Sequence, residues 1–189
     1  MYTPDQVRAA EQPLLARLGE KLMLSAAFAV AVECARLLDH HPYGKRVLVL
    51  AGSGGNGGDA LYAAEELERR GAHITVWQTS TGLHHAYRRP EEPTAAAAAR
   101  ADLIIDGVVG IGASGGLRGE AARAASIIAE HATCPVVAVD IPSGVDPMTG
   151  VPGDSYIRAT STVTFGGLKP VHVLGWEYCG DVVLRGLGI

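Results

Sequence analysis

The chain has 189 residues, 48% of them hydrophobic, and its formal net charge is −4. This length supports one α/β domain with a substantial core and is too short for two ordinary domains. The negative charge and the lack of a tract dense in lysine and arginine argue against a nucleic-acid backbone as partner, because such binding depends on neutralising phosphates. We therefore expect a single domain over residues 1–189 that acts on a small molecule.

Two helices are predicted over residues 1–44. Thr3 is placed to cap a helix that has Pro4 at its first position. A second helix, roughly 20–39, carries an alanine-rich stretch that would allow close approach to a neighbour. We expect this small-residue face to be a packing surface, and we predict a homodimer formed through these helices.

Strand and helix patterns then alternate through residues 45–189. Such alternation predicts βαβ crossovers and a parallel sheet with helices on both faces, which is a Rossmann-like three-layer αβα sandwich. The segment 79–101 is less regular, and only 95–100 is predicted to be helical. The expected strands are 46–50, 73–77, 102–106, 136–140, 161–165 and 182–184, and the expected helices are 59–70 and 118–132.

The three cysteines, Cys34, Cys134 and Cys179, are far apart and form no C-x-x-C motif. This pattern indicates inert thiols rather than zinc or redox chemistry. The first residues lack the basic-then-apolar order of a secretion signal, and the longest apolar run, 22–32, is about half of a membrane span. The sequence therefore predicts a soluble, cytoplasmic protein.

A glycine-rich loop, 52–59, follows the first predicted strand and contains the spacing G-x-G-x-x-G. Its backbone N–H groups can converge on an anion at a helix N-terminus. A conventional NAD-binding unit also has an acidic residue after the next strand, whereas this chain has Gln78-Thr79-Ser80. Asp59 in the first turn would also repel a pyrophosphate. We expect a different kind of ligand binding here; the alternative is a tight turn that only lets strand and helix pack closely.

Two aspartates end further predicted strands. Asp106 leads into a second glycine-rich segment that ends at Arg118, which would either pair with a phosphate or be solvated. Asp140 leads into a turn that orients Ser143. The carboxyl ends of parallel strands meet where ligands bind, and partial burial suits a carboxyl for proton transfer. Asp140 is therefore a candidate acid and base; capping a turn is the alternative for either aspartate alone.

Asn56, Asp106 and Ser143 offer only oxygen ligands, which suit a hard cation rather than zinc. Because two of the three donors are neutral, we expect a weakly held monovalent ion. Ser143 is not predicted to be a hydrolase nucleophile, since it lacks the G-x-S-x-G elbow. Its pairing with His172 would be conjecture.

Four motifs in order along the chain resemble the NAD(P)H-hydrate epimerase family: 52–59, 106–112, 139–146 and 164–170. The resemblance implies a Rossmann-like domain that epimerises the hydrated nicotinamide ring of (R)-NADHX or (R)-NADPHX. The S form would then be repaired by an ATP- or ADP-dependent dehydratase.

The resemblance also implies residue roles. One potassium ion per subunit would be bound by Asn56, Asp106 and Ser143. Asp140 is the hypothesised acid and base of the epimerisation. The residues expected to contact the hydrated NADH or NADPH are Gly55, Asn56, Gly57, Gly58, Asp59, Gly110, Ile111, Gly112, Ala113, Ser114, Gly115, Gly116, Arg118, Asp140 and Lys169.

Three features depart from the family pattern. Gly55 stands where the family usually has asparagine, and the stretch between Trp77 and Asp102 is shorter than usual. Both predict weakened activity. No dehydratase domain follows Ile189, which is expected of a free-standing epimerase, a domain cut from a fusion or a degenerate homologue.

Two other functions are alternatives for this sequence. A catalytically weak or inactive nucleotide-binding or scaffolding module on the same fold is the main alternative. A conventional NAD-dependent oxidoreductase is disfavoured by the missing ribose-binding acid.

Overall fold

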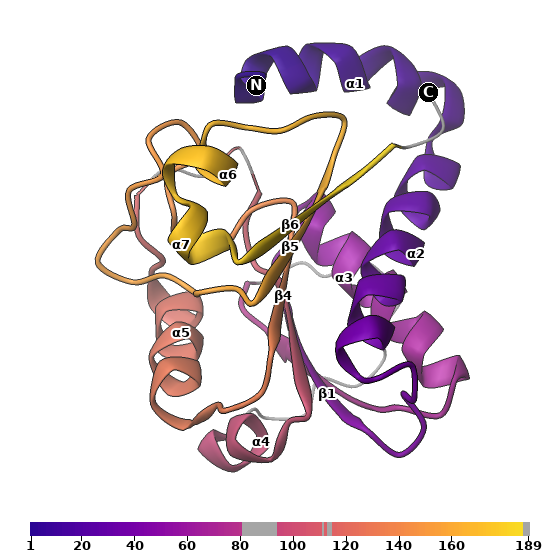
Figure 1. Cartoon of the computed structure of the whole chain (residues 1–189), viewed down its shortest axis with the longest axis vertical. Coiled ribbons are helices and arrows are strands. Elements are labelled where there is room, and N and C mark those ends of the chain that lie inside the picture. Colours follow the sequence, from indigo (N-terminus) through magenta and orange to yellow (C-terminus); the bar gives the residue numbers. More distant parts are fainter. Residues whose placement is uncertain (81–93, 111, 113–114, 187–189) are drawn as a thin grey trace.

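The computed structural model describes residues 1–80, 94–110, 112 and 115–186. Within these residues six strands form one parallel sheet in the order β2-β1-β3-β4-β5-β6, with helices on both faces (Figure 1). The predicted Rossmann-like sandwich is therefore confirmed. The strands are β1 (Arg46–Ala51), β2 (His73–Gln78), β3 (Leu103–Gly107), β4 (Val136–Val139), β5 (Ser161–Phe165) and β6 (Asp181–Arg185).

The central strands are apolar on both sides because each face is covered by helices. In β1, Val47 and Val49 face one core with α2 (Glu20–Leu37) and α3 (Gly55–Arg69). Leu48 and Leu50 face the other core, under α4 (Ala95–Arg100) and α5 (Gly119–His131). This alternation is the two-residue period of a strand. Because both faces are packed against helices, the ends of the central strands are held in fixed positions.

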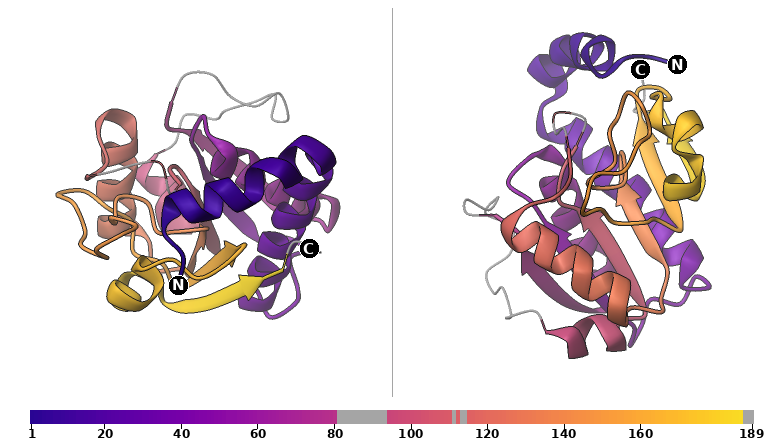
Figure 2. Two further views of the ribbon diagram at one scale, coloured as in Figure 1. Left: turned by 90° about the horizontal axis from the view of Figure 1, so that it is seen from above. Right: turned by 90° about the vertical axis from the view of Figure 1, so that its left-hand side faces the viewer.

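The first helix, α1 (Pro4–Leu18), begins as predicted. The Thr3 N–H donates to Gln6 Oε1 at 2.9 Å, and the Gln6 N–H donates to Thr3 Oγ1 at 3.2 Å, which is a capping box. The Tyr2 N–H donates to the Leu168 carbonyl at 2.8 Å. The chain start is thereby tied to the segment after β5, and α1 lies across that end of the molecule (Figure 2).

The alanine-rich face of α2 is a packing surface, as predicted, but its neighbour belongs to the same chain. Ala26, Ala27 and Ala31 are buried in the core that α2 shares with α3. Leu24 and Phe28, which flank the buried face of α2, are exposed. The alanines are therefore used inside the fold.

Two local predictions were wrong. The helix after β1 begins at Gly55 and not at Asp59, because Gly54 is extended and acts as the N-cap, so Asp59 lies beyond the first turn. No clear helix is predicted between β5 and β6, yet the structure has α6 (Val171–Leu174) and α7 (Trp176–Cys179). Helices of four residues are too short to produce a periodic signal.

The short helix predicted at 95–100 is confirmed as α4, which Thr94 caps by accepting a hydrogen bond from the Ala97 N–H at 3.2 Å. Cys34 and Cys179 are buried free thiols, and burial raises the pKa of both, which fits the predicted inert role. Among the described helices there is none with the length and apolar character needed to cross a membrane.

Candidate functional site

The loops that follow β1, β3 and β4 lie at one edge of the sheet, since all strands are parallel and β3 lies between β1 and β4. This edge is where ligands bind in open α/β sheets. It brings together the three segments that the sequence singled out, which start near residues 52, 107 and 140. These three loops form the candidate site.

Asp106 and Ser143 are in direct contact at this edge, and both are fully buried. The Ser143 hydroxyl donates to Asp106 Oδ1 at 2.6 Å, and the Ser143 N–H donates to Asp106 Oδ2 at 2.8 Å. The Val108 N–H donates to Oδ1 at 3.3 Å, and the Val109 N–H donates to the Ser143 hydroxyl at 3.1 Å. Burial raises the pKa of Asp106 to about 6, because only neutral groups of the described chain bond to it.

Asn56 reaches the same place from the first turn of α3. Its Nδ2 donates to the Val139 carbonyl at 2.7 Å and to the Val109 carbonyl at 3.2 Å. A side chain on Gly110 would press against this amide, since a Cβ there would lie 3.0 Å from its nitrogen and oxygen. The amide therefore bridges the loops after β3 and β4, one residue before Asp140.

These groups fit a monovalent cation. A buried carboxyl group that lacks a basic partner among the described residues is poorly solvated, and a bound cation would stabilise its ionised form. The carbonyl oxygens of Val109 and Val139 converge beside Asn56, and oxygen donors of this kind suit hard cations. The three residues predicted as a set from the sequence thus lie together.

Asp140 lies in a second cluster, which the sequence did not anticipate. Lys169, 1% exposed, forms an ion pair with Asp140 Oδ1. The Lys169 Nζ also donates to Thr164 Oγ1 and to the Phe165 carbonyl, both at 2.9 Å, and the Thr164 hydroxyl donates to Asp140 Oδ1 at 2.9 Å. The ammonium group therefore has three oxygen acceptors inside the protein, which is what a buried charge requires.

His172 connects the two members of this ion pair. Its Nδ1 accepts a hydrogen bond from the Lys169 N–H at 3.0 Å, so the proton is on Nε2, which donates to the Asp140 carbonyl at 2.8 Å. Burial lowers the pKa of His172 and favours this neutral form. The structure thus places His172 beside Asp140. The available sequence signal was its spacing, three residues after Lys169 in the segment that forms α6.

The backbone of Asp140 is in the left-handed region, with a φ of 68°. This conformation costs about 1–2 kcal/mol for a residue with a Cβ, and aspartate tolerates it better than most. The Asp140 N–H donates to the Val163 carbonyl at 2.7 Å, and the Asp140 carbonyl accepts from His172. Strain that is held in place by such bonds is typical of functional positions.

The glycine loop combines two uses. A Cβ on Gly52 would lie 1.9 Å from the Val108 carbonyl oxygen, and one on Gly57 would lie 2.0 Å from the Gly52 carbonyl oxygen. These glycines are needed for close packing, which was the alternative considered for the loop. Cβ atoms on Gly54 and Gly55 would meet nothing within 4 Å, and both residues are exposed. The packing explanation therefore accounts for only part of the loop.

The remaining predicted residues are scattered around this edge. Gly115, Gly116 and Arg118 line a cavity of about 290 Å³ beside the ends of β1, β2 and β3. Gly58 is buried in the first turn of α3, Asp59 is half-buried, and Gly112 is exposed. The predictions for Ile111, Ala113 and Ser114 lie outside the described residues.

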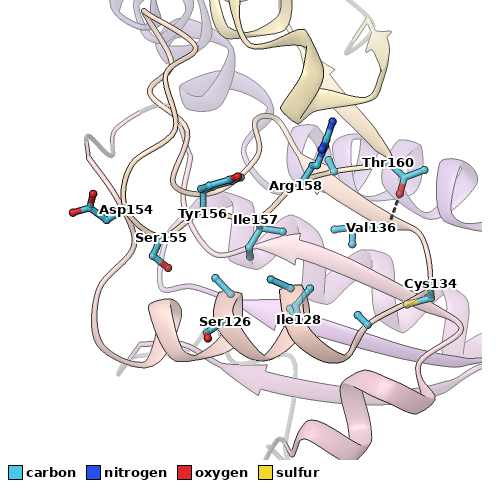
Figure 3. Close-up of a pocket in the computed structure, with 14 residues that line it drawn as sticks. Ser126, Ile128, Cys134, Val136, Asp154, Ser155, Tyr156, Ile157, Arg158 and Thr160 are labelled. Carbon is cyan, nitrogen blue, oxygen red and sulfur yellow. Dashed lines mark hydrogen bonds between the residues drawn. The ribbon is translucent and has the colours of Figure 1, made fainter.

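A larger cavity, about 660 Å³, lies elsewhere (Figure 3). It runs between α5 and the segment 154–160, and it reaches Cys134 and Val136 at the start of β4. None of the predicted site residues that the structure describes lines it. Its size therefore does not mark the candidate site.

The fold and the two aspartate clusters define a Rossmann-like α/β protein with a candidate ligand site at the carboxyl edge of its sheet. Residues 19–89 and 79–171 match the family model described as YjeF-related protein N-terminus. The chain belongs to this family, and the resemblance to NAD(P)H-hydrate epimerases stated from the four motifs is confirmed.

Similar proteins differ in length. A bifunctional NAD(P)H-hydrate repair enzyme of Mycobacterium tuberculosis is 46% identical over all of this chain, which covers 41% of that protein. An NAD(P)H-hydrate epimerase of Clavibacter sepedonicus is 42% identical, with 100% of this chain and 90% of the relative covered. The crystal structure of the yeast protein ynu0 has a TM-score of 0.75 at 20% identity, covering 95% of this chain and 86% of that one. The chain thus spans about two fifths of the bifunctional relative.

Proposed function

We propose that this chain is an NAD(P)H-hydrate epimerase, which interconverts the R and S forms of the hydrated cofactor for metabolite repair. The observation that carries the proposal is the buried ion pair of Asp140 and Lys169 at the ligand-binding edge of the sheet. It is supported by the relatives of Clavibacter and Microbacterium, whose names state this activity.

The reaction needs one proton to be moved twice. The hydrated ring carries a hydroxyl on the carbon next to nitrogen, and the nitrogen lone pair expels it as water once an acid protonates it. The planar iminium that remains takes water back on either face, and a base removes the proton. One carbon–oxygen bond breaks and another forms at the same carbon, so no oxidant or reductant is required.

Asp140 is the residue we assign to this proton transfer. The ion pair with Lys169 holds one exchangeable proton between carboxylate and amine, and Thr164 and Phe165 orient it. When the pair gives up that proton it carries a net negative charge next to the cationic iminium. The Asp140 carboxylate is already held in position before this charge develops, so it stabilises the intermediate with little reorganisation.

A potassium ion is the cofactor we propose, held by Asn56, Asp106 and Ser143. When bound, it would supply a fixed positive charge that stabilises the ionised form of Asp106. The residues themselves join α3 to the loops after β3 and β4, and the Asn56 bond to the Val139 carbonyl holds the backbone just before Asp140. This set of contacts positions the catalytic loop.

A weakened or inactive nucleotide-binding or scaffolding module is the second candidate, and Gly55 favours it. This residue is exposed in the first turn of α3, and it lacks the amide that the family usually has there. The loss removes a hydrogen-bonding group and leaves the backbone N–H groups of the turn in place.

We further propose that the protein works in the cytoplasm with an ATP- or ADP-dependent NAD(P)HX dehydratase, since longer relatives are named bifunctional NAD(P)H-hydrate repair enzymes. A homodimer is also proposed. Because the alanines of α2 are buried, the surface available on that helix includes Leu24 and Phe28.

The test is the exchange of freshly prepared (R)-NADHX and (R)-NADPHX into the S forms, followed by chromatography. We expect the protein to accelerate exchange well above the spontaneous rate. An exchange rate equal to the spontaneous one, with tight binding of the substrate, would support the inactive module instead. Hydride transfer from bound NADH to a carbonyl would support an oxidoreductase.

A further inference from the structure

A cavity lies beside the ends of β1, β2 and β3. The cavity of about 290 Å³ is bounded by Ser53 after β1, Thr79 and Ser80 after β2, and Arg118 at the start of α5. In the strand order, β3 separates β1 and β2 from β4, the strand that ends at Asp140. The cavity is therefore displaced along the sheet edge from the ion pair.

The chemistry of this cavity suits an anion. None of its described lining residues is acidic, and Arg118 supplies a guanidinium group. Ser80 Oγ is a buried hydroxyl without a hydrogen-bond partner among the described residues. Buried polar groups are nearly always bonded, so an unpaired hydroxyl in a cavity points to a ligand. The one acidic group in the first turn of α5, Glu120, is bonded to Trp77 Nε1 at 2.8 Å and to Arg123.

The place of Ser80 in the fold adds to this. In NAD-binding units the end of the second strand carries an acid that binds the ribose hydroxyls, and an arginine near this point accommodates a ribose phosphate. Here the strand ends in hydroxyl side chains, and an arginine faces the same cavity. An acid would repel a phosphate, whereas these groups donate to it.

We propose that this cavity binds a phosphate group of the dinucleotide substrate through Ser53, Ser80 and Arg118. The inference rests on the proposed function for the identity of the ligand. Two sources share this chemistry: the 2′-phosphate, present only in NADPHX, and the pyrophosphate, present in both substrates. The position at the end of β2 favours the 2′-phosphate.

Binding of fragments without a nicotinamide ring tests the subsite independently of catalysis. Affinities of the full chain for ADP-ribose and for 2′-phospho-ADP-ribose are measured by calorimetry, with Arg118→Leu and Ser80→Ala as variants. Arg158→Leu and Ser126→Ala, which line the larger cavity on another face, are the matched controls. Thermal melting of each variant verifies that it is folded.

With a 2′-phosphate in the cavity, the wild type binds 2′-phospho-ADP-ribose about tenfold more tightly than ADP-ribose, and Arg118→Leu removes this difference. Ser80→Ala weakens the same probe several-fold. Equal weakening of both probes by the two variants supports the pyrophosphate as the source. Unchanged binding of both probes in both variants, or equal weakening in the controls, overturns the subsite. A protein that binds the probes in this way and does not accelerate exchange would refute the epimerase and leave the subsite standing.

Discussion

Asp106 and Asp140 occupy matching places near the ends of the adjacent strands β3 and β4, but their surroundings differ. Asp106 is fully buried and accepts hydrogen bonds from Ser143 and Val108, all from neutral donors. Asp140 is paired with Lys169 and held by His172 through its backbone. Equivalent positions in the fold thus place two carboxyl groups in different electrostatic surroundings, which is the basis of the cation-binding role proposed for Asp106 and the proton-transfer role proposed for Asp140.

The largest expected effect follows from removing the lysine. Lys169→Met leaves the Asp140 carboxylate in a buried site without its charged partner, so we expect the free energy of unfolding to fall by about 3–5 kcal/mol. Urea denaturation measures this change. The double variant Lys169→Met/Asp140→Asn should recover part of the loss, because no unpaired charge remains. A loss below about 1 kcal/mol in the single variant would contradict a buried pair.

Asp106 should produce a pH dependence of stability. Burial raises its folded-state pKa to about 6 from the ordinary 3.8, so between these values the folded state holds a proton that the unfolded chain has lost. Stability from this group is therefore lost as the pH rises from about 4 to about 6, by about 3 kcal/mol in total. Asp106→Asn should abolish this component in denaturation curves recorded without potassium.

Potassium should change the melting temperature in a way that depends on the ionisation of Asp106. If Asn56, Asp106 and Ser143 hold the ion, potassium chloride should raise the melting temperature above pH 6 relative to choline chloride at equal ionic strength. The rise should be absent near pH 4, where Asp106 is protonated, and in Asp106→Asn. A rise that is unchanged in this variant would place the ion elsewhere.

Replacing His172 should lower the stability by less than replacing Lys169, and its pH dependence of stability should be opposite to that of Asp106. His172→Phe removes both bonds that hold Asp140 and Lys169, which costs about 1–3 kcal/mol for the unpaired groups. We also expect kcat to fall about tenfold with little change in KM, because the proton-transferring pair is displaced. His172→Gln should restore part of the rate, since its amide has a donor and an acceptor. A change in KM without a change in kcat would argue against a positioning role. An equal fall in kcat in His131→Phe, a variant on α5, would argue against it as well.

The pH sign of His172 is opposite to that of Asp106. Burial lowers the folded-state pKa of His172, so the unfolded chain binds a proton first as the pH falls below about 6.5. Stability is therefore lost on acidification through this window. Difference curves between wild type and His172→Gln isolate this component, and a curve that is flat from pH 4 to pH 7 would contradict the buried neutral imidazole.

Gly55 gives the smallest expected effect. A Cβ there meets nothing within 4 Å, so Gly55→Asn should fold normally and return the amide that the family usually has. We expect kcat/KM for exchange to rise several-fold, as a single hydrogen bond to substrate allows. Gly57→Ala is the contrasting control, because its Cβ would lie 2.0 Å from the Gly52 carbonyl oxygen and should destabilise the fold. An unchanged kcat/KM in Gly55→Asn would mean that the missing amide does not limit the exchange reaction.

The sequence predicted the sheet and the proximity of Asn56, Asp106 and Ser143 because both depend on local patterns. Buried strands read as apolar runs, and in a parallel sheet their carboxyl ends must meet, which placed Asn56, Asp106 and Ser143 together. The partnership of Asp140 with Lys169 was not predictable in this way. Lysine is rarely buried, so its residue type predicts that Lys169 lies on the surface. Its burial here depends on the turn after β5 and on α6, whose four residues carry no periodic signal.

The central claim is that Asp140 transfers the proton during exchange of the hydrated ring. Asp140→Asn keeps the size of the side chain and its contact with Thr164, and it removes the carboxyl group. The direct measurement is the rate of (R)-NADPHX to (S)-NADPHX exchange for wild type and Asp140→Asn at saturating substrate, with folding verified by thermal melting. The account predicts exchange in the variant at about the spontaneous rate. Exchange in a folded Asp140→Asn variant at the wild-type rate would contradict it.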